Sequence, residues 1–170
     1  MKYAEVRSEI KDGDLVFLRR KTGLLPKLIT NVTGEPETHT CIALWVDGRV
    51  MVAGMASINC LFPLSHYQHL DFDIYPCPSD RVLIRESAFK FLGMEIQYAV
   101  TDLVTTAIRM LLSLDFGHSK SKMICTAWVV NVLRDAMGNS RFDFLRPDSA
   151  PSDLRKLLNC KPKFEVRNAV

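Results

Sequence analysis

The dipeptide Asp47-Gly48 constrains the fold of this chain more than any other local feature. It separates two apolar runs, at residues 40–46 and residues 49–53. An Asp-Gly pair between two apolar runs is the strongest short-range sign of a β-hairpin, because both turn residues must tolerate a positive φ. The first third of the chain is therefore expected to contain an antiparallel pair of strands.

The rest of the pattern predicts strands first and helices second. Further strands are expected at residues 14–18 and 70–75, and the loop over residues 24–38 is placed to frame a cleft. From residue 80 the apolar residues recur with a helical period, which predicts helices at residues 82–92, 103–112, 122–138 and 152–158. This order favours an α+β fold over alternating βαβ units, and the tail at residues 163–166 either pairs as an edge strand or frays.

Composition limits the class of protein. The 170 residues are close to the size of one domain, so a single domain over residues 1–170 is expected. Hydrophobic residues make up 48% of the chain and charged residues 24%, a globular balance that excludes wholesale disorder. The net charge is only +3, and the longest basic run, Arg19-Arg20-Lys21, is interpreted as a solvated strand end. No nucleic-acid partner is predicted, and the oligomeric state is left open.

The cysteine pattern, the N-terminus and the longest apolar stretch indicate the cellular location to expect. Five cysteines without a CxxC pair predict neither a disulfide framework nor a zinc finger. The charged N-terminus has no apolar stretch typical of a signal peptide, so a cytoplasmic location is expected, with release or packaging by another route left open. The most apolar stretch, residues 103–114, is interrupted by Arg109 and is shorter than the ~20 residues that span a bilayer. No membrane span is predicted.

Two residues, Cys125 and His39, are candidates for a nucleophile and its base. Cys125 lies in the first turn of the helix expected from residue 122, just after Lys120 and Lys122. The positive end of the helix dipole, the free backbone N–H groups and the nearby cations all favour a thiolate. His39 opens the strand that leads into the hairpin. If this strand and this helix pack so that His39 reaches Cys125, the pair forms a base-activated nucleophile with backbone N–H groups as an oxyanion hole.

Each of these residues also has a purely structural interpretation. Free cysteine is among the most buried residue types, so Cys125 could fill the core, as Cys41 is expected to do. His39 could equally be a hydrogen-bonded histidine at the end of a strand. Spacing alone does not decide between these roles.

Four segments occur in the order found in one enzyme family. They are Gly13-Asp14-Leu15-Val16-Phe17, Thr38-His39-Thr40-Cys41-Ile42-Ala43-Leu44, Ile124-Cys125-Thr126-Ala127-Trp128-Val129 and Ala150-Pro151-Ser152-Asp153-Leu154. Together they span roughly residues 12–158 and resemble the motifs of circularly permuted papain-like cysteine hydrolases of the NlpC type, the YiiX-like group related to lecithin-retinol acyltransferases. The histidine precedes the cysteine by 125 − 39 = 86 residues, which is the permuted order.

The resemblance implies both a fold and an activity. The implied fold is permuted papain-like, an antiparallel sheet or small barrel packed against a helical layer. The implied enzyme is a thiol hydrolase with Cys125 as nucleophile, His39 as general base and an acyl-thioester intermediate, working without a metal or organic cofactor. Its substrate would be a small peptide or acyl compound, such as the amide bond of a peptidoglycan peptide or of another peptide or isopeptide. Two alternatives stay open: a catalytically impaired domain that serves as a binding or structural module, and a lipid acyltransferase or thioesterase.

One position departs from the family pattern. Relatives often carry a glutamate that orients the histidine, where this chain has Val52. An apolar side chain cannot hold the tautomer of the imidazole. Asn59, Ser57, His66 or a backbone carbonyl would then orient the ring, or a Cys-His dyad would act without a third residue, or activity has been lost.

Three further polar features have weaker assignments. Tyr98 either lines the substrate cleft, as the resemblance implies, or lies at the edge of the core with its hydroxyl in water. His118 is placed in the loop before the nucleophile helix, where it could contact substrate or replace His39 as the base. His66 and His69 are three residues apart, but no carboxylate or thiolate accompanies them in a helical register, so no metal site is predicted.

Overall fold

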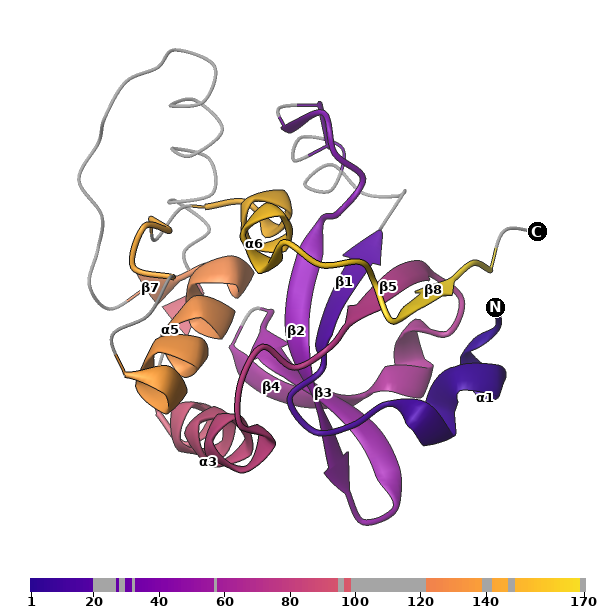
Figure 1. Cartoon of the computed structure of the whole chain (residues 1–170), viewed down its shortest axis with the longest axis horizontal. Helices are drawn as coiled ribbons and strands as arrows, with labels where there is room; N and C mark the ends of the chain where they lie inside the picture. The colour runs from indigo at the N-terminus through magenta and orange to yellow at the C-terminus, as the bar shows by residue number, and fades with distance from the viewer. Residues whose placement is uncertain are drawn as a thin grey trace.

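A six-stranded antiparallel sheet forms the centre of the molecule (Figure 1). The computed structural model describes residues 1–19, 27, 30–31, 33–56, 58–94, 97–98, 122–138, 142–146 and 149–168. The strands follow the order β4-β3-β2-β1-β5-β8, where β1 is Leu15–Arg19, β2 His39–Val46, β3 Arg49–Met55, β4 Asn59–Pro63, β5 Asp71–Tyr75 and β8 Phe164–Val166. A separate two-stranded parallel sheet pairs β6 (Gln97–Tyr98) with β7 (Lys122–Met123).

Helices cover both faces of the large sheet. Figure 1 shows α3 (Arg81–Leu92), α5 (Cys125–Met137) and α6 (Pro151–Leu158) on one side, and the short α1 (Tyr3–Val6) on the other. Two 3₁₀ turns, η1 (Arg7–Glu9) and η2 (Leu64–Tyr67), complete the elements of the described residues. The expected α+β class, with strands and helices segregated along the chain, is confirmed.

The predicted hairpin joins β2 to β3. Val46 pairs with Arg49, and the two residues between them have positive φ, 47° at Asp47 and 71° at Gly48. The strands expected at residues 14–18 and 70–75 are β1 and β5, and the tail pairs with β5 as the edge strand β8. Turn chemistry and apolar alternation were sufficient to find these elements, because each depends on residues close together in sequence.

Three predicted helices are also present. The Asp80 carboxylate caps α3 by accepting the backbone N–H groups of Val82 and Leu83, and Gly93 ends it. The helix expected from residue 122 begins later, at Cys125, because residues 122–123 pair with β6 instead. Residues 103–112, where a further helix is predicted, lie outside the described residues.

Strand alternation divides the core into two clusters, one on each face of the sheet. On the face of α3, α5 and α6, alternate strand residues such as Phe17 and Ile42 pack against Trp128 of α5. On the opposite face, Leu18 and Cys41 belong to a cluster closed by the N-terminal residues Tyr3, Val6 and Ile10. The segment preceding residue 12 was not predicted to be part of the core, because four helical residues carry no recognisable period.

Candidate functional site

Cys125 is the first residue of α5 and lies where this helix meets the start of β2. Hydrogen bonds from the backbone N–H groups of Thr40, Thr126 and Cys125 itself lower the pKa of its thiol. Thr40 is the residue next to His39, so the helix that carries Cys125 meets the strand that His39 begins. The sulfur therefore lies in a group of backbone donors supplied by two elements far apart in sequence.

Burial outweighs these donors. The Cys125 residue is only 4% exposed, and desolvation is the largest cause acting on its thiol, so the pKa is raised rather than lowered. Burial therefore opposes the thiolate that the helix start was expected to favour, because desolvation disfavours the charged form more strongly than the backbone donors favour it.

His39 is the first residue of β2, half-buried, and is paired directly with Leu18 of β1. Residues directly opposite in an antiparallel pair point their side chains to the same face. The Cβ of His39 therefore points to the face of Leu18 and Cys41, whereas α5 packs on the face of Thr40 and Ile42. A contact between the His39 ring and the Cys125 sulfur would have to pass around the end of the strand, and the role of His39 as base stays a prediction.

Two buried hydroxyls beside Cys125 were not singled out from the sequence. Thr40 and Thr126 are both fully buried, and neither hydroxyl has a hydrogen-bond partner with ordinary geometry among the described residues. The Thr126 hydroxyl is nevertheless close enough to the sulfur to lower the pKa of Cys125. Strand alternation predicts that Thr40 lies on the same face of β2 as Ile42. Only the tertiary structure shows that this is the face on which α5 packs.

Val52, at the position where relatives often carry a glutamate, has apolar surroundings. Val52 is 3% exposed and belongs, with its strand partner Ala43, to the cluster opposite α5. Its other strand partner, Phe62, is exposed. Of the residues proposed to replace the missing acid, Asn59 donates from its amide nitrogen to the carbonyls of Phe91 (2.9 Å) and Met94 (2.6 Å), whereas its buried amide oxygen has no hydrogen-bond partner among the described residues. This amide holds β4 to the end of α3. Ser57 lies outside the described residues.

Of the other residues named from the sequence, Tyr98, His66 and His69 lie in the described part of the chain. The backbone of Tyr98 pairs with Met123, two residues before Cys125, so its segment runs beside the approach to the nucleophile. His118 lies outside the described residues. His66 and His69 are both exposed, and His66 stacks on Phe62 at 6.0 Å between ring centroids.

The Gly-Asp segment at the start of β1 has a structural role. The Asp14 carboxylate, fully buried, accepts the backbone N–H groups of Lys11 (3.0 Å) and Cys77 (3.1 Å) and pairs with Arg81 at 2.7 Å. It thereby ties β1 to the segment between β5 and α3. The late Pro-Ser-Asp-Leu segment begins α6, where the Asp153 carboxylate accepts the N–H of Ala150 at 2.9 Å.

A buried network of charges precedes the site. Glu37, only 2% exposed, lies two residues before His39 and pairs with Arg19 (3.5 Å) and with Arg155 of α6 (3.4 Å). Arg19 also forms an ion pair with the buried Asp73 of β5. The interpretation of Arg19 as part of a solvated strand end is therefore wrong, because its guanidinium joins two buried carboxylates. Pairings across such sequence distances leave no local pattern to detect.

Two further features were searched for among the described residues: a metal site and a membrane-spanning helix. No group of three or more histidine, cysteine, aspartate or glutamate residues among them is arranged to hold a metal ion. Within the same part of the chain, the helices are too short or too polar to cross a membrane.

Fold and site together define an α+β protein in which a cysteine opens a helix packed on an antiparallel sheet. No family model matches the chain. No curated protein matches it either. Among solved structures the chain is similar to one described as metalloprotein yiiX from Escherichia coli O157:H7, DUF1105, with a TM-score of 0.56 and 16% sequence identity over 86% of this chain and 81% of the other. At this identity the similarity establishes a shared fold and nothing more.

Proposed function

We propose that this chain is a cysteine hydrolase of permuted papain-like fold that cleaves an amide bond with Cys125 as nucleophile. The observation that carries the proposal is the convergence of backbone N–H groups from Thr40, Thr126 and Cys125 on one sulfur at the start of a helix. The same donors that hold the sulfur would stabilise the negative oxygen that forms when a thiolate attacks a carbonyl. The four ordered sequence segments and the YiiX-like fold support this assignment.

The reaction would proceed in two steps. A base removes the proton from the Cys125 thiol, the sulfur attacks the amide carbonyl, and the nitrogen leaves with that proton as an amine. Water then hydrolyses the resulting thioester and releases the free acid and the thiol. Because burial raises the pKa of Cys125, the proton transfer needs a histidine close by. His39 is the first candidate for this base, and His118 is the second.

A binding or structural module is the second candidate, and two observations favour it. Cys125 is almost wholly buried, and this burial raises the pKa of its thiol. The register of β2 also directs the Cβ of His39 away from α5. The metal in the description of the yiiX structure is not carried over to this chain, because the described residues supply no matching group of ligands.

The rate at which iodoacetamide alkylates Cys125 as a function of pH distinguishes the two candidates. Peptide mass spectrometry would follow Cys125 and the exposed Cys160 within the same chain, so that Cys160 serves as the internal reference. The variants are His39→Ala, His118→Ala and, as a matched control, His69→Ala at an exposed histidine. For a hydrolase, Cys125 reacts well below the free-thiol pKa of ~8.5, and one of the first two variants, but not the control, abolishes this reactivity.

The same alkylation experiment can also contradict the hydrolase proposal. If Cys125 reacts more slowly than Cys160 at every pH, and neither histidine changes its rate, the thiol is a core residue. The hydrolase proposal would then be abandoned in favour of the module.

A further inference from the structure

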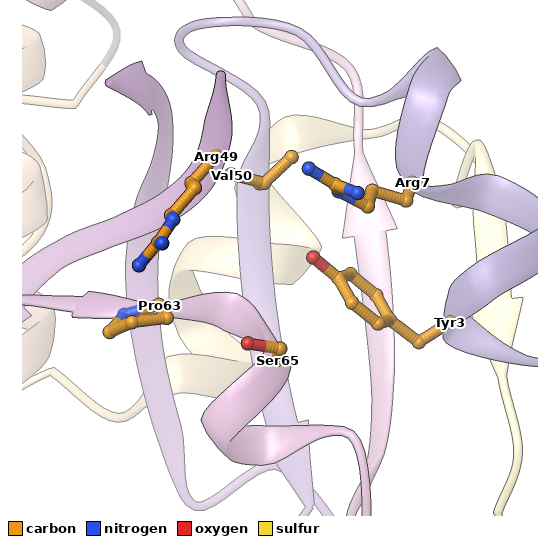
Figure 2. A pocket seen from close by; sticks show the side chains of 6 residues that line it. All are labelled: Tyr3, Arg7, Arg49, Val50, Pro63 and Ser65. Atoms are coloured by element: carbon orange, nitrogen blue, oxygen red, sulfur yellow. The ribbon is translucent and has the colours of Figure 1, made fainter. Parts of the chain in front are cut away.

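A cavity lies on the other face of the sheet from Cys125. It has a volume of about 270 Å³ and is lined by Tyr3, Arg7, Arg49, Val50, Pro63 and Ser65 (Figure 2). Tyr3 and Val50 belong to the cluster opposite α5, so the cavity is separated from the cysteine by the thickness of the sheet. Nothing in the proposed hydrolase chemistry uses it.

Two arginines at this cavity lack acidic partners. Among the residues that the structure describes, no carboxylate lies within 4.0 Å of the guanidinium of Arg7 or Arg49. Other arginines of the molecule behave differently, since Arg19, Arg81 and Arg155 each pair with at least one carboxylate. Two guanidinium groups at one hollow without a carboxylate make a local excess of positive charge.

Arg7 is held in place by its neighbours. It donates to the carbonyl of Gly48 at 2.8 Å, and its guanidinium carbon lies 5.7 Å from the centre of the Trp45 ring. It also contacts the Tyr3 hydroxyl, whose pKa is raised mainly by burial, so this hydroxyl stays protonated. A fixed guanidinium can bind an anion without first losing the freedom of a mobile side chain.

Arg49 and Ser65 stand across the cavity from Arg7 and Tyr3 (Figure 2). Both are exposed, so both side chains can turn toward a ligand that enters from solvent. Val50 and Pro63 add an apolar wall. The cavity thus combines two guanidinium groups and two hydroxyls with an apolar surface.

We propose that this cavity binds the phosphate group of a small phosphomonoester. A phosphomonoester carries between about one and a half and two negative charges at neutral pH and three acceptor oxygens, which matches two arginines and two hydroxyl donors. A carboxylate has only one charge and would leave one guanidinium without a counter-charge. The apolar wall then contacts the organic substituent of the ester.

Isothermal titration calorimetry with inorganic phosphate and with phenyl phosphate tests this proposal on the full chain. Phenyl phosphate is expected to bind saturably and more tightly than inorganic phosphate, and benzoate, with the same ring and one charge, more weakly than either. Arg49→Ala should weaken phenyl phosphate binding by roughly tenfold or more, the loss expected for one charge-assisted hydrogen bond. Lys11→Ala is the matched control, because it removes the same charge from an exposed residue outside the cavity.

The thermal midpoint of Arg49→Ala should equal that of the wild type, since Arg49 has no ion-pair partner to lose among the described residues. Binding should also change the fluorescence of Trp45, which lies beside Arg7. The proposal is overturned if phenyl phosphate shows no saturable binding, or if Lys11→Ala weakens binding as much as Arg49→Ala does. Neither result bears on Cys125, so this proposal and the hydrolase proposal fail separately.

Discussion

Replacing Gly13 with alanine should destabilise the fold by a calculable amount. Gly13 has φ +81°, in the region that side-chain-bearing residues rarely adopt, and it precedes the buried Asp14. A Cβ at this position would lie 2.6 Å from the Cys77 sulfur and 3.4 Å from the Ile84 Cγ2 atom. The substitution therefore introduces both backbone strain and a steric overlap.

The two costs can be separated in magnitude. An alanine in the left-handed region costs about 1–2 kcal/mol. Overlap in a packed region adds about 1–3 kcal/mol, because the Cys77 thiol is itself held by a hydrogen bond to the carbonyl of Ser79 at 3.2 Å. We expect Gly13→Ala to lower the free energy of unfolding by about 2–5 kcal/mol.

Urea unfolding at equilibrium measures these costs. Gly48→Ala is the matched control, because Gly48 has φ +71° and a Cβ added there would meet no atom within 4 Å, so it should show the backbone cost alone. Cys77→Ala removes the obstructing sulfur, so Gly13→Ala should cost less in the Cys77→Ala background than in the wild type. If Gly13→Ala costs no more than Gly48→Ala, or costs the same in both backgrounds, the steric part of the reasoning is refuted.

Two further substitutions test the surroundings of the site. Thr40→Val removes a buried hydroxyl that lacks a hydrogen-bond partner among the described residues, and should raise the free energy of unfolding by about 1 kcal/mol; a decrease in the same urea assay would mean that the hydroxyl is bonded. Burial raises the pKa of the Cys125 thiol in the folded state, so the folded protein keeps its proton at a pH where the unfolded chain loses it. The stability of the wild type relative to Cys125→Ala should be fully present below pH ~8.5 and decline above it, by at most about 1.4 kcal/mol per pH unit. A difference that stays constant as the pH rises would contradict the raised pKa.

The elements that could be predicted are those specified by neighbouring residues. The Asp47-Gly48 turn, the glycine that ends α3 and the glycine that ends α5 act over a few residues, so each left a local pattern. The position of Cys125 at the start of a helix followed from the same kind of pattern. Its approach to β2 was stated only as a condition, because no local pattern shows which elements pack together.

The state of the cysteine could not be predicted. The helix start and its backbone donors were visible in the sequence, but they oppose a desolvation that depends on every group packed around the sulfur. The same holds for Arg19, whose buried partners Glu37 and Asp73 come from other segments. Charge and burial at a site are sums over residues distant in sequence.

The sequence by itself determined the local structure: the strands, the hairpin turn, the helix ends and the residues able to act as nucleophile or base. Tertiary structure alone decided which face of β2 receives α5, and with it that Thr40 rather than His39 points its side chain toward that helix. It also brought Arg7 and Arg49 to one cavity from separate segments. The physical reason is that hydrogen bonds within turns and helices act between close neighbours, whereas burial and charge pairing act through space and depend on the packed fold.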